Sequence, residues 1–415
     1  MKKLVQFLDR ETNEVLSRLR EFGDAWIVGG WLRDSLIEGH PKDNQLDIDI
    51  ATSLIPEMVK EIFPNSIGVG ENFGTVGVRL DSSINRVWEV TTLRTERNYS
   101  DGRRPDAVDF GVTILEDLAR RDFTINAMAL DKMGNIIDPF GGQRDIEDSI
   151  VRAVGNPSER IQEDGLRILR AFRFMDSGKR KIRKLDTSLS NSIVEQLASL
   201  DNISKERVGS ELMKIFSGQY KSEIITSMKK HGIFDVILPG INIKNSYKFT
   251  DSKVVNLALL CSASNMNGME ISNYLMDKLR ISKEDSRRIS ILHNCREIEL
   301  DSSIKSVRRF LAFHEDEMRM MIVEYLKSLD TDLDEFISNL NSVKLRENNK
   351  PLIDGYMLSD LTGLEPSIRL GKLKDWLFRI QIEEDITEIE EVLKFLNELD
   401  WKNSEIDNLA GMKWP

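Results

Sequence analysis

Cysteine and histidine are scarce in this sequence, which has two cysteines and four histidines among 415 residues. The two cysteines, Cys261 and Cys295, lie far apart and lack the close spacing that metal ligands require. We interpret them as buried thiols in a reducing compartment, and we expect no zinc chemistry.

Long apolar stretches are also absent. No run of about 18 apolar residues occurs, so we expect no membrane-spanning segment. The first residues include Lys2, Lys3, Asp9 and Arg10, a stretch too polar for a secretory signal. Together these absences predict a cytoplasmic protein, and nothing in the sequence requires a protein partner.

An excess of positive charge is missing too. The chain has 58 lysines and arginines against 69 aspartates and glutamates, a net charge of −11. Phosphate binding needs positive charge only locally, however, and basic residues cluster in 94–104, 160–173 and 179–184. A nucleic-acid-binding role therefore stays open, with 179–184 as a candidate contact to RNA. The alternative is that residues 179–184 form an exposed, solvated loop.

The pattern of apolar residues changes near position 140. Residues 1–140 combine helical periodicity with short alternating segments, which predicts mixed structure around a sheet of about five strands. From about residue 145 onward the periodicity is almost entirely helical. Since the length suffices for two to four domains, we predict an α+β fold with an α/β head and a long all-helical remainder.

The first pattern that suggests chemistry is Gly29-Gly30-x-x-Arg33-Asp34, which follows the apolar segment 25–28. Two glycines between a strand and a helix let backbone N–H groups approach a phosphate closely. Arg33, one helical turn further on, can add a charged fork to the same phosphate. The alternative is a strand–helix turn in which the glycines serve only tight packing.

A pair of carboxylates follows in Asp47-x-Asp49. The alternation of a strand puts both side chains on one face, where they and nucleotide phosphates can hold a divalent metal ion. Glu89, in a predicted strand over 86–93, is the candidate for a third carboxylate. The alternative is that these acids are ordinary charges on a solvent-facing strand edge.

Charged residues then recur at every third position of one segment, at Asp164, Arg167, Arg170 and Arg173. On a helix such residues form one slowly turning stripe. An aspartate accepts hydrogen bonds and an arginine donates a planar fork, so this stripe can complement the edge of a base. The alternative is a surface ladder of ion pairs.

Three strings of residues carry a resemblance to a known family. They are Gly29–Asp34 with Leu46–Asp49, the string Arg120-Arg121-Asp122-Phe123-Thr124-Ile125-Asn126-Ala127, and Glu163–Phe174. Together they resemble the signatures of the class II CCA-adding enzymes and bacterial poly(A) polymerases, which share a polymerase-β-like nucleotidyltransferase head. The resemblance implies an all-α neck, body and tail after that head. We accordingly predict a head over 1–140, a neck over 141–200, a helical body over 201–300 and a tRNA-binding tail over 301–415.

The resemblance also implies a role for each site residue. Asp47 and Asp49 would be catalytic and would bind Mg²⁺, with Glu89 as a further catalytic carboxylate. Asp164 and Arg167 would select CTP and ATP by reading the base, and Arg121 and Asp122 would contact the sugar. The nucleotide-binding residues would be Gly29, Gly30, Arg33, Arg121, Asp122, Asn126, Asp164, Arg167, Arg170 and Arg173. Without the family, Asp122 could equally be a helix N-cap.

The activity implied is the template-independent addition of C, C and A to the 3′ end of tRNA, with release of pyrophosphate. Gly70–Val76 resembles the strand entry of CCA-type enzymes, and residues 95–110 resemble the loop with which such enzymes move from CTP to ATP. Alternatives within the family are poly(A) synthesis and partial addition of CC or A. A catalytically silent RNA-binding protein would have lost the carboxylates, and a small-molecule nucleotidyltransferase would not need the long helical body.

Overall fold

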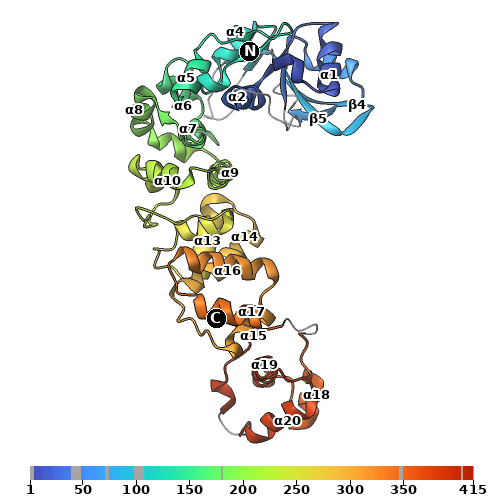
Figure 1. The fold of residues 1–415 in the computed structure, drawn as a ribbon, viewed down its shortest axis with the longest axis vertical. Helices are drawn as coiled ribbons and strands as arrows, with labels where there is room; N and C mark the ends of the chain where they lie inside the picture. Colours follow the sequence, from blue (N-terminus) through green and yellow to red (C-terminus); the bar gives the residue numbers. More distant parts are fainter. Residues whose placement is uncertain are drawn as a thin grey trace. The chain divides into compact units, whose positions relative to one another are not determined.

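The computed structural model describes residues 4–38, 48–70, 74–97, 107–178, 181–344, 349–402 and 405–414. Contacts divide the chain into two units, residues 1–246 with 277–280, and residues 247–276 with 281–415. Strands gather in the N-terminal part of the chain, and helices make up almost all of the rest (Figure 1). This distribution confirms the predicted α+β fold class. Asp47, Lys179, Arg180 and most of the 95–110 segment lie outside the described residues.

A seven-stranded sheet forms the centre of the first unit, in the order β3-β4-β5-β2-β1-β8-β9. Strands β2 and β5 run parallel, and the other neighbours are antiparallel. The strands are β1 (Ala25–Val28), β2 (Asp49–Thr52), β3 (Ile67–Gly70), β4 (Thr75–Leu80), β5 (Ser83–Thr92), β8 (Ala129–Leu130) and β9 (Ile136–Ile137). The predicted number of about five strands was too low, and the short strand β3, in which glycine alternates with Ile67 and Val69, was not predicted.

Two short strand pairs lie outside this sheet. They are β6 (Arg94–Arg97) with β7 (Ala107–Phe110), and β10 (Ile150–Val151) with β11 (Lys184–Leu185). The first unit also contains α-helices and short 3-10 helices. They are η1 (Leu4–Phe7), α1 (Arg10–Arg20), α2 (Gly29–Glu38), α3 (Pro56–Ile62), α4 (Ile114–Ala119), η3 (Thr124–Asn126), α5 (Gly142–Asp148), α6 (Pro157–Glu163), α7 (Leu166–Met175), α8 (Thr187–Glu195), η4 (Leu197–Asn202), α9 (Lys205–Phe216), α10 (Lys221–Lys230) and α11 (Ile233–Ile237).

A small apolar cluster fixes the strand ends and helices that surround the candidate site. It joins β1, β2, β8 and α4 to single residues that follow η3, β5 and β10. Its buried members are Val28, Ala51, Leu93, Leu118, Ala127, Ala129 and Val154. Because most of these side chains are small, the backbones that carry the polar site residues approach one another closely.

Helix α7 is strongly amphipathic, and this decides which of its residues reach the site. Ile168, Leu169, Ala171 and Phe172 are fully buried. The three arginines at positions 167, 170 and 173 are spaced one turn apart on the other face. Burial of the apolar face therefore turns the arginines toward the polar side of the helix.

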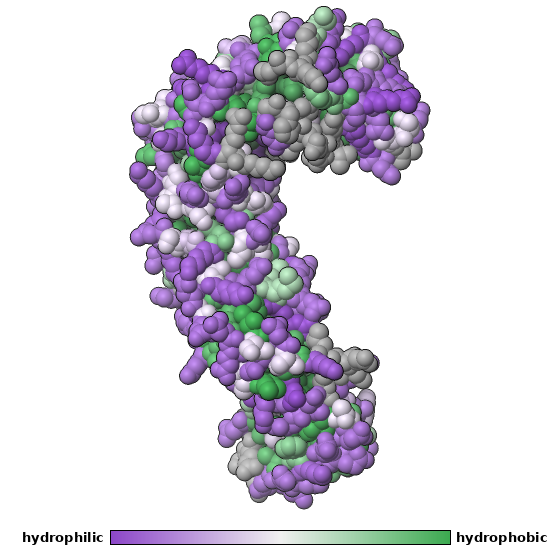
Figure 2. Space-filling view, viewed as in Figure 1, coloured by the Kyte–Doolittle hydropathy of each residue, from purple (hydrophilic) through white to green (hydrophobic). Residues whose placement is uncertain are grey.

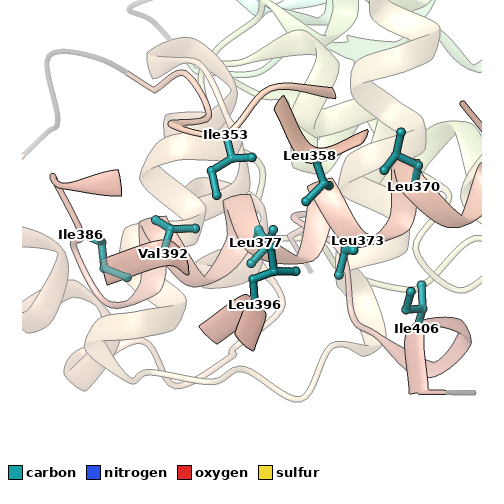
Figure 3. Packing of buried hydrophobic residues seen from close by; sticks show 9 residues of the cluster. All are labelled: Ile353, Leu358, Leu370, Leu373, Leu377, Ile386, Val392, Leu396 and Ile406. Carbon is teal, nitrogen blue, oxygen red and sulfur yellow. The ribbon is translucent and has the colours of Figure 1, made fainter. Parts of the chain in front are cut away.

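The second unit is helical. It contains α12 (Lys253–Leu260), α13 (Gly268–Leu279), whose last residues belong to the first unit, α14 (Lys283–Asn294), η5 (Cys295–Glu297), α15 (Ile304–Phe313), α16 (Asp316–Ser328), α17 (Asp334–Ser342), α18 (Gly355–Thr362), α19 (Ile368–Glu383), α20 (Ile389–Glu398) and η6 (Glu405–Asn408). A hydrophobic cluster packs around α19, with Leu370, Leu373 and Leu377 on one face (Figure 3). Cys261 and Cys295 are buried free thiols, as predicted, and burial raises the pKa of each to about 12.

The C-terminal segment returns to the core of the second unit. Trp414 is 3% exposed, and its ring lies 4.5 Å from that of Phe310. Its indole N–H donates to Ser306 Oγ at 3.1 Å, and its carbonyl oxygen lies 3.0 Å from His314 Nε2. Burial lowers the pKa of His314 to about 4, so this ring is neutral near pH 7.

Hydrophilic residues cover most of the described surface on the face shown in Figure 2, and apolar residues occur there in small patches. Within the described ranges, no helix has both the length and the apolar character needed to cross a membrane.

Candidate active site

Gly29 is the point at which strand β1 meets helix α2. Its φ of +75° is a backbone conformation that glycine adopts without strain. A Cβ atom at this position would lie 2.2 Å from Asp49 Oδ2, which is too close for any side chain. Tight packing against Asp49 therefore requires glycine at this position. Gly29 and Gly30 also line a cleft, so close packing and access to a ligand occur together here.

Asp49 begins strand β2 between two neighbouring strands. It is the register partner of Val28 on β1 and of Glu89 on β5. Residues paired in this way have side chains on the same face of the sheet, so Asp49 and Glu89 lie side by side. Asp49 is partly buried and lines the cleft, whereas Glu89 is exposed and is not among the lining residues. Among the described residues, no group of three or more potential ligands could hold a metal ion.

The cleft has a volume of about 900 Å³. It brings together predicted residues from all three sequence strings and adds others that the sequence did not single out. Its lining residues are Gly29, Gly30, Arg33, Asp49, Arg94, Arg120, Arg121, Asp122, Asn126, Asp164, Arg167, Arg170, Arg173, Phe174, Asp176, Lys214 and Ser217. All the predicted nucleotide-binding residues are among them.

A chain of hydrogen bonds joins the three sequence strings inside this cleft. Arg33 donates to Asn126 Oδ1 at 2.8 Å, and the Asn126 amide donates to Asp122 Oδ1 at 3.1 Å. Arg170 donates to Asp122 Oδ2 through Nε at 2.8 Å. Helix α2, the turn at η3 and helix α7 are thereby locked into one polar wall.

Asp122 is the buried centre of this chain, with 9% of its surface exposed. Burial by itself would raise its pKa, but the charge of Arg170 and the hydrogen bonds from Asn126 and Arg170 outweigh that effect. The result is a pKa below the ordinary value, so this carboxylate is charged at neutral pH. The N-cap alternative is wrong, since the residue that caps η3 is Phe123.

Phe174 is a cleft residue that the sequence did not single out. The guanidinium carbons of Arg33, Arg170 and Arg173 lie 5.1, 5.4 and 4.5 Å from the centre of its ring. Each position permits a cation–π interaction. One aromatic ring therefore gathers three positive charges from two helices, α2 and α7.

Asp164 does not lie on the predicted helical stripe. Helix α7 begins at Leu166, and Asp164 has an extended backbone (φ −151°, ψ 104°) at the end of α6. Its Oδ1 accepts from the Leu166 N–H at 3.0 Å, and its Oδ2 pairs with Arg207 at 2.6 Å. The stripe is correct for Arg167, Arg170 and Arg173 and wrong for Asp164, because the extended backbone of Asp164 separates α6 from α7. A Cβ on Gly165 would lie 2.5 Å from Ser199 O.

Arg167 is held beside Asp164 by several acceptors. Its NH1 donates to Glu163 Oε2 at 2.5 Å and to the Arg160 carbonyl at 2.9 Å. Its NH2 donates to the Arg120 carbonyl at 3.3 Å. The direction of this guanidinium is thus fixed from three sides.

Two basic residues at another part of the cleft share one buried carboxylate. Glu211, on α9, is 3% exposed and pairs with Arg173 at 3.2 Å and with Lys214 at 3.0 Å. Burial lowers the pKa of Arg173, as do its neighbours Arg170 and Arg33, whereas Glu211 and Asp122 act in the opposite direction.

Within the basic block 179–184, Arg183 is neither a contact to RNA nor part of an exposed loop. It is 2% exposed, and it donates to the Phe174 carbonyl at 2.8 Å and the Asp176 carbonyl at 3.0 Å. These carbonyls lie at the C-terminal end of α7, where a cation is favourable. Arg183 is therefore a buried structural residue.

For some of the other cleft residues a sequence signal was available, and for others it was not. Arg120 precedes Arg121 directly, and Phe174 follows Arg173, so adjacency could have indicated both. Asp176 accepts from the Gly178 and Tyr220 N–H groups. Neither Asp176 nor Ser217 carries a signal in the sequence.

Comparison with known proteins places this geometry in context. Residues 25–152 match the family model "Poly A polymerase head domain", and residues 184–244 match "Probable RNA and SrmB-binding site of polymerase A". The chain is 34% identical to the CCA-adding enzyme of Lactococcus lactis subsp. lactis (strain IL1403) over 384 residues, 88% of this chain and 90% of that enzyme. It is 31% identical to the CCA-adding enzyme of Ligilactobacillus salivarius (strain UCC118), over 91% of this chain and 93% of that enzyme.

Solved structures give the same picture. The Bacillus stearothermophilus CCA-adding enzyme in complex with CTP matches with a TM-score of 0.78 and 27% identity, over 96% of this chain and 99% of that one. The Thermotoga maritima CCA-adding enzyme complexed with tRNA matches with a TM-score of 0.62 at 19% identity, over 96% of this chain and 97% of that one, which shows a shared fold.

Proposed function

Since the chain belongs to the family of CCA-adding enzymes, we propose that it adds C, C and A in turn to the 3′ end of tRNA. CTP and ATP supply the nucleotides, and pyrophosphate leaves at each step. One observation carries this proposal: a single cleft of about 900 Å³, the size of a small-molecule site, contains Asp49, the arginine cluster and the Asp164–Arg167 pair. We also propose that the protein works in the cytoplasm.

The metal of this reaction is proposed to be Mg²⁺, held by Asp47 and Asp49. The donor chemistry fits, because Mg²⁺ prefers carboxylate oxygens and phosphates, and Asp49 lies in the cleft wall. Glycine at position 29 keeps the space next to Asp49 Oδ2 clear of a side chain. When bound, the ion activates the attacking 3′-oxygen and neutralises charge on the leaving pyrophosphate. Glu89, beside Asp49, is proposed as the further catalytic carboxylate.

The rest of the cleft binds and orients the nucleotide. Arg33, Arg170 and Arg173, gathered on Phe174, are proposed to hold the triphosphate together with the Gly29 and Gly30 amides. The second string supplies the residues that we assign to the sugar, which are Arg121, Asp122 and Asn126. The RNA 3′-hydroxyl attacks the α-phosphorus in line with the pyrophosphate that leaves, so fixing both partners contributes to the rate.

The base is proposed to be read by Asp164 and Arg167. Cytosine and adenine both present an exocyclic amino group, a donor, beside an accepting ring nitrogen. An aspartate beside an arginine complements that order, whereas guanine and uracil present a carbonyl oxygen in place of the amino group. The bonds from Arg207 to Asp164 and from Arg167 to Glu163 hold both side chains in fixed directions. A rigid pair of this kind can select CTP and ATP without a template.

The helices beyond the catalytic part are proposed to bind tRNA. In this division the head is 1–140, the neck 141–200, the body 201–300 and the tail 301–415. The tail and body would hold the folded tRNA mainly through its shape and phosphates.

The direct test is extension of tRNA that lacks its terminal CCA. The protein is incubated with this tRNA, Mg²⁺, and CTP and ATP separately and together, and product lengths are read on a gel. We expect CTP alone to add two residues and both nucleotides to add three. Long A tails would instead identify a poly(A) polymerase, and a stop after CC with both nucleotides present would identify a partial enzyme.

The Asp49→Asn variant is expected to bind CTP and to transfer nothing.

A further inference from the structure

A buried acid stands behind two of the cleft arginines without lining the cleft itself. Asp117 lies on the short helix α4 (Figure 1) and is 1% exposed. Thr113 caps this helix and forms a capping box with Glu116. The capping box fixes the start of the helix and thereby the direction of the Asp117 side chain. Asp117 therefore occupies a fixed position immediately behind the cleft wall.

The two oxygens of Asp117 serve two different arginines. Oδ1 accepts from Arg120 Nε at 3.0 Å and from Arg120 NH2 at 2.7 Å. Oδ2 accepts from Arg121 NH2 at 3.2 Å. Both arginines line the cleft, with side chains 18% and 19% exposed. One carboxylate thus sets the direction of two adjacent guanidinium groups that would otherwise repel each other.

Further contacts connect this group to the rest of the site. Arg121 NH1 also donates to the carbonyl of Asn126, the residue that bonds Arg33. The carbonyl of Arg120 accepts from Arg167, which belongs to the proposed base-reading pair. The backbone N–H of Arg94, another cleft residue, reaches Asp117 Oδ1 at 3.4 Å. Asp117 is thus joined through its arginines to the proposed sugar, phosphate and base sites.

An acid in this position is costly unless it is ionised and paired. Burial raises the pKa of Asp117, but the charges and hydrogen bonds of Arg120 and Arg121 outweigh burial and bring the pKa below its ordinary value. The carboxylate is therefore charged near pH 7. Removing its charge would leave the two arginines without the anion that orients them.

We propose that Asp117 is a positioning residue for nucleotide binding: it fixes Arg120 and Arg121 on the cleft wall, and through them it sets affinity for the nucleoside triphosphate and discrimination of the sugar. This inference rests on the proposed function, since the assignment of Arg121 to the sugar belongs to it. Asp117 itself touches no substrate. It acts only through the two arginines.

The test compares Asp117→Asn with the wild-type protein. Asparagine has the same shape but no charge, and it offers one accepting oxygen in place of two. We expect the KM for CTP to rise at least about tenfold, the scale of a lost charged hydrogen bond, with a smaller change in kcat. We also expect the preference for CTP over dCTP, as the ratio of kcat/KM values, to fall several-fold. An unchanged KM and an unchanged ratio would overturn the proposal.

A matched control separates positioning from stability. Glu383→Gln removes another buried carboxylate, 8% exposed, whose Oε1 accepts from Arg309 at 2.8 Å and from Arg379 at 2.7 Å in the second unit. It should lower the urea midpoint to a similar extent and leave the CTP/dCTP ratio as it is. If both variants change the ratio equally, Asp117 is only a structural residue and the proposal fails.

A second variant covers the case in which Asp117→Asn does not fold. Asp117→Glu keeps the charge and moves it by one methylene, so the arginines stay paired but shift. We expect a folded protein with a lower CTP/dCTP preference, and an unchanged preference would count against the proposal. CTP affinity is also measured by calorimetry. Wild-type protein that binds CTP but extends no tRNA would contradict the proposed function, and the Asp117 variants would then be compared by their calorimetric affinities for CTP and dCTP.

Discussion

At the scale of single residues, Gly29 is the position where the structure leaves least freedom. Gly29→Ala would place a methyl group 2.2 Å from Asp49 Oδ2 and would force alanine to a φ of +75°. We expect the rate of transfer from CTP to fall by about 100-fold or more, because small displacements of a catalytic carboxylate are costly. The Gly30→Ala variant should lose less, since its added carbon meets nothing closer than Arg33 NH2 at 3.7 Å. Equal rates in the two variants would contradict this reading.

Phe174 carries a second prediction at this scale. Phe174→Leu removes the ring that three guanidinium groups contact and leaves an apolar side chain of similar size. Each contact contributes on the order of 0.5–2 kcal/mol, so we expect the KM for CTP to rise by about tenfold. Phe174→Tyr keeps the ring face and serves as the control, with a KM near that of the wild type. Steady-state kinetics at saturating tRNA would check both values, and a leucine variant with the wild-type KM would refute the idea.

At the scale of elements, helix α7 depends on a residue that follows it. Arg183→Met would leave the Phe174 and Asp176 carbonyls without their donor at the helix end. We expect the free energy of unfolding to fall by about 2–3 kcal/mol in a urea titration. The salt dependence of tRNA binding should keep its slope, because this arginine reaches no phosphate.

Lys181 is the natural comparison for Arg183, since it comes from the same basic block but is exposed. Lys181→Met should leave the urea midpoint unchanged. If Lys181 contacts RNA, its loss reduces the slope of binding against salt by about one unit. A reduced slope in the Arg183 variant instead would show that the buried position is wrong.

Asp117 and Asp122, which form ion pairs with the cleft arginines, predict how the free energy of unfolding responds to pH. The folded pKa values of Asp117 and Asp122 lie below the ordinary value of 3.8, so ionised carboxylates stabilise the fold. That contribution is complete above the ordinary pKa and is lost as pH falls through the lowered values. We expect the free energy of unfolding to drop between about pH 5 and pH 2. Asp122→Asn should be less stable at pH 7 and should show a shallower drop, and an equal slope would disprove the role of Asp122.

Sequence alone predicted the local parts of this architecture and missed what depends on distant partners. The glycine turn, the Asp49 strand and the arginine face of α7 follow from adjacency and periodicity. The bond between Arg33 and Asn126 spans 93 positions, so no local pattern could reveal it. Arg183 was misread for the opposite reason: a basic run indicates a solvated surface, and only the packed helix end shows the carbonyls that it binds. Asp164 left the stripe because its backbone is extended, and its partner Arg207 lies 43 positions away in the sequence.

At the scale of the whole molecule, each unit has its own core. A substitution in one core should therefore destabilise that unit without abolishing the function of the other. Trp414→Ala would remove a ring that contacts Phe310, Phe336 and His314 inside the second unit. We expect a loss of about 3–5 kcal/mol in the stability of that unit. CTP binding, which we assign to the first unit, should be preserved at temperatures where the second unit is still folded. Trp401→Ala is the control, since Trp401 is only partly buried. Loss of CTP binding in the folded Trp414 variant would contradict the separation.

The position of Trp414 also bears on how the chain is made. The hydrogen bonds that hold it reach back 100 and 108 positions, to His314 and Ser306. During synthesis Phe310, His314 and Phe336, which surround Trp414, would emerge from the ribosome long before Trp414 itself. Contacts between residues this distant in sequence form late. Until Trp414 covers them, these apolar side chains are exposed to chaperones and proteases. A nascent chain halted a few residues short of Trp414 would therefore carry every residue of the proposed active site and still be a target for degradation.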